Sequence, residues 1–191
     1  ATSFMIHSKA DLHMHSHHSD GIWSVEALLA EAQARGLHAL SITDHDVLDA
    51  YPKAFELAQV HNLKILPGIE LSTEFEHTSV HVLGYGFDLQ HEGLLELIAE
   101  LRQARELRIQ SMLERLAKRN IHIELDDLKK AFPHGILGRP HIAQWMVSQN
   151  LCRSVEEVFQ NYLGDHSMGS LRLKTIGTQE AIALLHDAKG V

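Results

Sequence analysis

Six side chains of the types that bind metal ions occur in the first 85 residues, most of them close to strand-like segments. They are His13, His15, Asp20, His45, Glu70 and His81. One residue separates His13 from His15, so in a strand both imidazoles project to the same side while Met14 points to the other. Imidazole and carboxylate ligands without cysteine suit zinc, manganese or iron, and a carboxylate such as Glu70 can bridge two ions. The sequence therefore predicts a metal centre.

The later members of this set follow or lie in apolar runs. His45 closes the run Ala-Leu-Ser-Ile-Thr-Asp-His, and Glu70 closes Leu-Lys-Ile-Leu-Pro-Gly-Ile-Glu. His81 lies in the alternating segment Ser-Val-His-Val-Leu-Gly-Tyr. We expect the six side chains to converge on one cavity at the carboxyl ends of neighbouring strands. Asp11 and Asp44 flank these ligands and are expected to orient the imidazoles rather than to bind metal.

The composition is that of a soluble globular protein. Of its 191 residues, 45% are hydrophobic and 22% are charged. The chain is therefore long enough and apolar enough for a sizeable core. No apolar stretch approaches the roughly 20 residues needed to span a bilayer, and the first ten residues lack the apolar segment of a signal peptide. The single Cys152 cannot form an internal disulfide. We interpret the chain as cytoplasmic, without a membrane partner.

The net charge limits the class of nucleic acid that the chain could bind. A formal charge of −8 argues against a long basic groove that would hold a duplex by displacing its counterions. Divalent ions would nevertheless add positive charge where a phosphate must dock. Nucleotides or short RNA are therefore compatible substrates, whereas a long duplex is not.

Strands and helices alternate in the first part of the chain. We predict strands over 9–15, 37–43 and 63–71, with helices over 25–35 and 49–62. Ser24 is the expected N-cap of the first helix and Gly36 its C-terminal stop. Residues 74–87 alternate apolar and polar side chains, as a hairpin or an edge strand does. This order indicates an α/β fold with a parallel sheet or barrel.

Helices dominate the second part. They are predicted over 91–120, 125–131, 139–149, 154–162 and 178–188. In the longest helix, arginines at 102, 105, 108 and 115 are interpreted as a solvated face. We divide the chain into the N-terminal part of a barrel (1–88), a helical insertion (89–170) and a return to the barrel (171–191).

The last residues suggest that the fold continues. Gly190 occupies a C-cap position after a helix, and Val191 would begin the next strand. A (β/α) barrel takes about 250 residues and seven or eight strands, whereas about four strands are expected here. The prediction is that the C-terminal strands lie outside this chain, and that a further segment or a second copy of the chain completes the site.

Four motifs in order resemble the polymerase and histidinol phosphatase (PHP) family. They are Asp-Leu-His-Met-His-Ser-x-x-Ser-Asp-Gly from Asp11, Ile-Thr-Asp-His-Asp from Ile42, Pro-Gly-Ile-Glu-Leu-Ser from Pro67 and Val-His-Val-Leu-Gly-Tyr from Val80. Gly-Arg-Pro-His-Ile-Ala from Gly138 and Val-Phe-x-x-Tyr-Leu from Val158 extend the resemblance. They are similar to the branch that hydrolyses 3′,5′-nucleoside bisphosphates and trims short RNA from the 5′ end.

The resemblance implies a distorted (β/α)7 barrel with three divalent ions, of manganese, iron or zinc. His13, His15 and Glu70 would hold the first ion, Glu70 and His81 the second, and Asp20 and His45 the third. The family's Ala-His-Pro histidine and late Asp-x-His pair have no counterpart here. Residues 164–170 also depart from the branch's usual Gly-Lys-Pro-x-Tyr-Val stretch, which removes the expected substrate contacts of that loop.

The implied activity is that of a metal-dependent phosphoesterase. The metals would activate a water for in-line attack on phosphorus, and no serine elbow or phosphate-cradling glycine loop is present. Arg139 and His141 are the candidate substrate-binding residues, since a guanidinium can make paired contacts with phosphate; the alternative is a helix start with a surface arginine and a packed histidine. Two other functions remain open, an amidohydrolase-like C–N hydrolase and a noncatalytic metal-binding PHP module.

Overall fold

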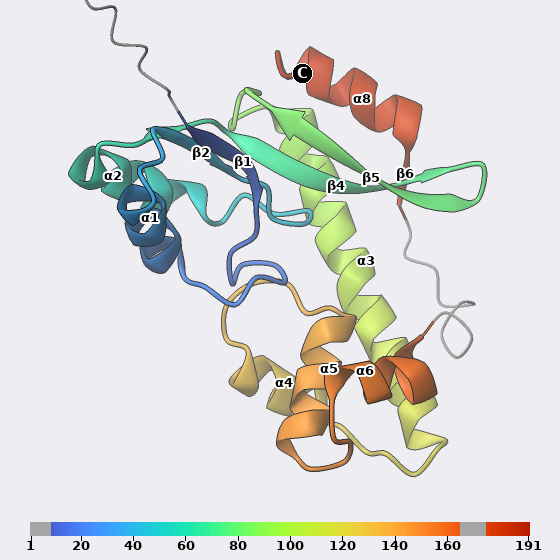
Figure 1. Ribbon diagram of the computed structural model, residues 1–191. Coiled ribbons are helices and arrows are strands. Elements are labelled where there is room, and N and C mark those ends of the chain that lie inside the picture. The colour runs from blue at the N-terminus through green and yellow to red at the C-terminus, as the bar shows by residue number, and fades with distance from the viewer. Residues whose placement is uncertain (1–8, 165–174) are drawn as a thin grey trace, which may run out of the picture.

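The computed structural model describes residues 9–164 and 175–191. Its first part is a parallel three-stranded sheet in the order β1-β2-β3, formed by β1 (Ala10–Met14), β2 (Ala39–Ile42) and β3 (Lys64–Ile65). The crossover helices α1 (Val25–Ala34) and α2 (Tyr51–His61) pack against each other beside this sheet (Figure 1). Their apolar side chains and those of β2 form one hydrophobic cluster, as the alternation of strands and helices predicts.

A second sheet begins after Pro67. Strands β4 (Gly68–Phe75) and β5 (Thr78–Tyr85) form an antiparallel hairpin, and the short β6 (Ile176–Gly177) pairs parallel to β4. The expectation of a hairpin is thus confirmed, and the expected parallel pairing holds for β1, β2 and β3 and for β6 with β4, but not between β4 and β5. Only two residues separate β4 from β5, and a parallel connection needs a dozen or more.

The two sheets meet where the polar motifs end β2 and begin β4. An isolated parallel bridge pairs His45 with Glu70, with Glu70 N donating to Asp44 O (3.3 Å) and Asp46 N donating to Glu70 O (3.1 Å). Glu70 is therefore the third residue of β4, and not the last residue of a strand as the sequence predicts. The chain bends between β3 and β4, and this bend brings Glu70 level with the carboxyl end of β2.

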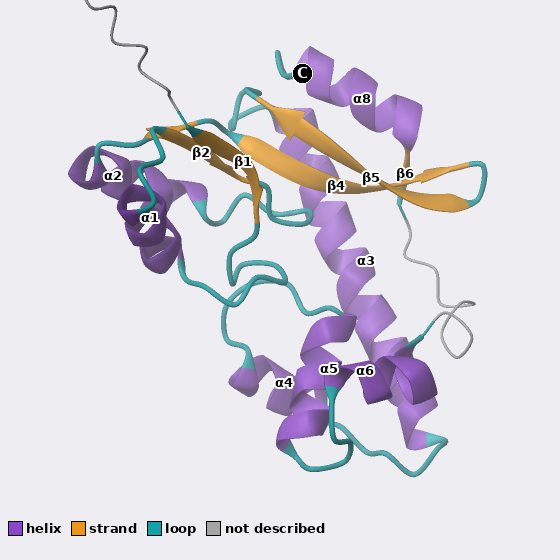
Figure 2. Ribbon diagram, viewed as in Figure 1, coloured by secondary structure: helices purple, strands orange, loops and turns teal. Residues whose placement is uncertain are grey.

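A 26-residue helix, α3 (Glu92–Ala117), connects the sheets to a separate group of helices. At 1.5 Å per residue it is about 39 Å long. Its first half packs in a hydrophobic cluster with β4 and with α8 (Thr178–Asp187), while its second half belongs to another cluster. Figure 2 shows this second group of helices well separated from the strands. Its other members are α4 (Leu125–Ala131), α5 (Arg139–Ser148), α6 (Val155–Val158) and the π-helix η1 (Phe159–Leu163).

The fold is thus a mixed α/β arrangement with a helical body attached through α3. Predicted and observed helices agree to within three residues at each end, except that the segment 154–162 divides into α6 and η1. Among the residues that the structure describes, no helix is both long enough and apolar enough to cross a membrane.

Tyr51 at the start of α2 fastens the two sheets to each other. Its buried hydroxyl donates to Ile42 O (2.6 Å) and accepts from Gly68 N (2.5 Å). Burial raises the pKa of this phenol to about 12, so it stays protonated as a donor. The contact fixes the end of β2 relative to the start of β4, the two segments that carry His45 and Glu70.

We expect Tyr51→Phe to lower the free energy of unfolding by about 1–3 kcal/mol, because the Gly68 N–H and the Ile42 carbonyl would lose a buried partner. Urea denaturation measures this. Tyr162→Phe is the matched control, since that ring packs under Arg119 at 4.4 Å, and its hydroxyl should contribute less than about 0.5 kcal/mol. An equally small effect for Tyr51→Phe would contradict the assignment.

Candidate metal centre

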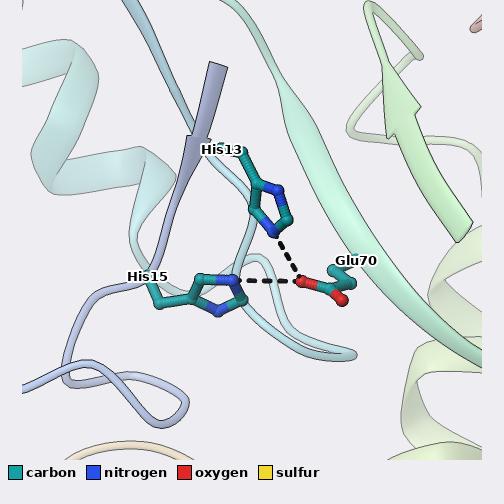
Figure 3. A group of neighbouring side chains, drawn as sticks. All are labelled: His13, His15 and Glu70. Atoms are coloured by element: carbon teal, nitrogen blue, oxygen red, sulfur yellow. Dashed lines mark hydrogen bonds and ion pairs between the residues drawn. The ribbon is translucent and has the colours of Figure 1, made fainter. Parts of the chain in front are cut away.

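The carboxylate of Glu70 is the meeting point of the predicted ligands. Glu70 Oε2 lies 3.0 Å from His13 Nε2 and 3.0 Å from His15 Nε2 (Figure 3). The alternation of β1 explains this pair, because His13 and His15 project to one side while Met14 packs against the hydrophobic cluster behind the strand. Only 8% of the Glu70 side chain is exposed, so its charge depends on these partners.

The other Glu70 oxygen faces the hairpin strand β5. His81 Nδ1 lies 2.8 Å from Glu70 Oε1, and His45 Nε2 lies 3.9 Å from Glu70 Oε2. The rings of His45 and His81 approach edge to face, with 4.7 Å between their centroids. The two oxygens of one carboxylate thus face different imidazoles, as a bridging ligand requires.

Asp20 joins the group from the loop after β1. Its Oδ1 lies 3.2 Å from His15 Nδ1, and its Oδ2 lies 3.7 Å from His45 Nε2. Gly21 closes this loop: a Cβ there would lie 2.1 Å from the carbonyl oxygen of His15, so a larger residue would displace the backbone. The glycine of the Ser-Asp-Gly motif therefore holds Asp20 near both imidazoles.

Asp44 reaches the imidazole of His15 through Ser19, whose Oγ lies 3.4 Å from His15 Nδ1, whereas Asp11 binds the backbone. The buried Asp44 carboxylate accepts from Ser16 N (2.7 Å), Ser16 Oγ (2.5 Å) and Ser19 Oγ (2.6 Å). Asp11 Oδ1 accepts from the backbone N–H of His13 (3.2 Å). Asp44 thereby fixes the loop that presents Asp20.

The six side chains form three overlapping groups of possible ligands, in each of which the ligand atoms lie within 4.8 Å of one another. The groups are His13, His15 and Glu70; His15, Asp20 and His45; and His45, Glu70 and His81. Nitrogen and carboxylate oxygen donors in such groups fit zinc, manganese or iron. The structure thus brings together all six residues that the sequence singles out, in groups that could hold divalent metal ions.

Without a metal ion, protons compensate the two carboxylates. Hydrogen bonds to Asp20 and then Glu70 raise the pKa of His15 to about 10, and the His15 contact lowers the pKa of Asp20 to about 2. Burial alone would raise the pKa of Glu70, but the hydrogen bonds from His15 and His81 outweigh it and hold this pKa well below its usual range. Burial lowers the pKa of His45. Positive charge is therefore favoured at the positions that a cation would take.

Arg105 on α3 belongs to the site, although the sequence analysis places it on a solvated face. Its side chain is only 16% exposed, and Nε and Nη2 donate to Asp46 Oδ2 at 2.8 and 2.5 Å. Nη2 also donates to Ser72 Oγ (2.7 Å). Arg105 lies four residues from both Leu101 and Ile109, which are buried, so it belongs to the face of α3 that packs against the protein. Arg102 follows the expectation and is 52% exposed.

A cavity of about 570 Å³ opens beside the ligand groups, between the β4–β5 hairpin and the helical body. Arg139 and His141, the predicted substrate-binding residues, both line it. Arg139 at the start of α5 lies 5.9 Å above the ring of Phe159. His141 accepts from Gly138 N through Nδ1 (2.9 Å) and thereby caps α5, and burial lowers its pKa.

Three of the six candidate ligands and two further arginines line the same cavity, whereas His13, His15 and Glu70, which were expected to face it as well, are not among its lining residues. The cavity lining includes Asp20, His45, His81, Arg105 and Arg108. Candidate metal ligands and guanidinium groups thus line one space, an arrangement suited to an anionic ligand. The sequence predicts lost substrate contacts in the loop 164–170. This loop lies outside the described residues from 165 onward.

Comparison with known proteins gives concordant results. The family model for the PHP domain matches residues 11–164. The chain is 31% identical to the 5′-3′ exoribonuclease Rnm of Escherichia coli over 94% of its own length and 62% of the relative's. It is 26% identical to a 3′,5′-nucleoside bisphosphate phosphatase of Chromobacterium violaceum over 95% of its length and 64% of the relative's.

A solved structure from Bifidobacterium adolescentis, of a candidate metal-dependent phosphoesterase, superposes with a TM-score of 0.89 and 30% identity. The match covers 97% of this chain and 65% of that one. The chain therefore spans less than two thirds of the length of each of these three proteins.

The overlap of the ligand groups predicts graded losses of metal. Glu70 belongs to two groups and His13 to one, so Glu70→Ala should remove more bound manganese, iron or zinc per protein than His13→Ala. Elemental analysis of the purified protein measures this, with the exposed His122→Ala as the control. Unchanged metal content in both site variants would exclude the assignment.

Proposed function

Because this chain belongs to the PHP domain family, we propose that it forms the metal-binding part of a phosphoesterase that acts on nucleotides or short RNA. One observation carries the proposal: three groups of candidate metal ligands overlap in pairs through His15, His45 and Glu70. Three of their members, Asp20, His45 and His81, line one cavity together with Arg105, Arg108 and Arg139. A cation site alone fits many enzymes. A cation site beside guanidinium groups fits an anionic substrate, and phosphate esters are the natural class.

The ligands would divide among three ions, of manganese, iron or zinc. His13, His15 and Glu70 would hold the first, Glu70 and His81 the second, and Asp20 and His45 the third. When bound, such ions lower the pKa of water and neutralise phosphoryl oxygens. The role of the protein is to fix the ligands: Asp44 holds the loop of Asp20, and the His45–Glu70 bridge sets the spacing between the two sheets.

Arg139 and His141 would bind the substrate from the helical side. The Arg139 guanidinium lines the cavity and can donate two parallel hydrogen bonds to a phosphate. Gly138 N donates to His141 Nδ1, so Nε2 is the nitrogen that carries the proton, and the ring also interacts with the Ser19 backbone. The neutral imidazole favoured by burial would serve as a hydrogen-bond donor rather than as a cation.

The volume of the cavity and the net charge of the chain favour a short substrate. The cavity volume of about 570 Å³ is within the range of roughly 300–1,000 Å³ that is usual for small-molecule sites. The formal charge of −8 does not favour binding of a long duplex. The names of two relatives, a 5′-3′ exoribonuclease and a 3′,5′-nucleoside bisphosphate phosphatase, support RNA ends and nucleoside bisphosphates as the substrates to test.

The wider architecture is also a proposal. We place the described strands in a distorted (β/α)7 barrel of the PHP type, with the barrel part over 1–88, the helical insertion over 89–170 and the return over 171–191. The parallel order β1-β2-β3 supports the barrel. The second half of α3 packs with the other helices of the proposed insertion, which supports an inserted helical body, while its first half packs with β4 and α8.

The metal-loaded full-length protein should release inorganic phosphate from 3′,5′-nucleoside bisphosphates and shorten small RNAs from the 5′ end, while long duplex should be a poor substrate. Phosphate release and gel analysis measure this, with Glu70→Ala as the inactive control. Equal activity on amides would favour a C–N hydrolase. Tight metal binding without hydrolysis of any phosphate ester would favour a noncatalytic module.

Arg139→Ala should mainly weaken substrate binding, by about 1.5–3 kcal/mol for a lost charge-assisted contact. The expected result is a raised KM with little change in kcat. Arg153→Ala, an exposed arginine outside the cavity, is the control. If Arg139→Ala left both kinetic constants at the parent values, its role would be to start α5 and not to bind substrate.

A further inference from the structure

Arg105 is a partly buried cation beside the candidate metal ligands, and binding of metal ions does not account for its presence there. It lies midway along α3, and its side chain is 16% exposed. Placing a guanidinium in such a position costs free energy unless a charged partner and further hydrogen bonds compensate it. The partner is Asp46, whose side chain is fully buried and which also accepts from Ser72 N and Ser72 Oγ, each at 2.7 Å.

The hydrogen bonds of Arg105 use only part of its guanidinium. Nε and Nη2 donate to Asp46, and the second Nη2 hydrogen is directed to Ser72. A guanidinium has five N–H donors in a fixed plane. Within residues 9–164 and 175–191, Nη1 and its two donors have no hydrogen-bond partner, and the side chain lines the cavity.

The neighbours of Arg105 place its guanidinium beside one particular ligand group. Ser72 follows Glu70 by two residues on β4, so the two side chains project from the same face. In the hairpin register Ser72 pairs with His81, and Asp46 directly follows His45. The residues that bind Arg105 are thus adjacent to His45, Glu70 and His81, which together form one of the three groups.

We propose that Arg105 is a substrate-contact residue whose Nη1 donates to an oxygen of a phosphate held at the His45, Glu70 and His81 group. Asp46 and Ser72 are positioning residues: they hold three of the five donors and thereby aim the other two at the cavity. The identity of the anion as a substrate phosphate rests on the proposed function. The presence of an anion site does not, because inorganic phosphate probes it without any reaction.

The test is calorimetric titration of inorganic phosphate into the manganese-loaded full-length protein. Arg105→Gln, which cannot supply the charge, should raise the Kd for phosphate at least about tenfold while bound manganese stays constant. Arg102→Gln, one turn earlier on α3 and paired with Asp49 at the surface, should stay within about twofold of the parent. A parent protein that binds no phosphate, or an Arg105→Gln variant with the parent Kd, would overturn the proposal.

A second variant separates substrate contact from folding. Arg105→Gln leaves the Asp46 carboxylate buried without its partner, so the double variant Arg105→Gln/Asp46→Asn restores a neutral pair. It should unfold at a denaturant concentration near that of the parent and still bind phosphate weakly. Recovery of phosphate affinity in the double variant, failure of both variants to fold, or loss of manganese in step with phosphate would each make Arg105 purely structural.

The two proposals fail in different ways. Phosphate binding that depends on Arg105, without hydrolysis of any ester, would reject the proposed activity and retain the anion site. Hydrolysis with the parent KM in Arg105→Gln would retain the activity and reject the contact.

Discussion

A buried carboxylate at the joint between two sheets sets the arrangement of the whole site. Glu70 lies where the bend between β3 and β4 meets the end of β2, and its side chain is 8% exposed. A charge in that position must be compensated, and three imidazoles from two segments, the end of β1 and strand β5, lie within 3.0 Å of its oxygens. Glu70 therefore takes part both in the contact between the two sheets and in the groups of candidate ligands. A substitution at Glu70 would disturb both.

Much of the site could be predicted from the sequence because its ligands lie in local patterns. The one-residue spacing of His13 and His15 fixes their common direction in a strand, and Asp20 follows in a loop that Gly21 closes. The helices were predictable for a similar reason, since 3.6-residue periodicity and caps such as Ser24 act within one or two turns. The placement of Glu70 within β4 was not, because it depends on a bridge between segments that are distant in sequence.

Arg105 shows where composition misleads. Four arginines in one helix are typical of a solvated face, and Arg102 fits that description. The buried apolar stripe of α3 nevertheless continues through position 105, where the apolar side chain is replaced by a cation whose partner, Asp46, comes from the loop after His45. A pairing across 59 positions leaves no local signal in a single sequence. The signal in the sequence is that a charged residue interrupts the apolar stripe of α3. Such an interruption is easily interpreted as a solvent-exposed position.

The bridge between His45 and Glu70 also has a consequence for how the protein acquires its metals. His13 and Glu70 are 57 positions apart, so the unfolded chain contains no complete ligand group that includes Glu70. Ions with the affinity of the finished site can bind only after the two sheets have met, and binding to the native state alone stabilises it by mass action. Supply of metal in the cell would then control the lifetime of the folded protein as well as its chemistry.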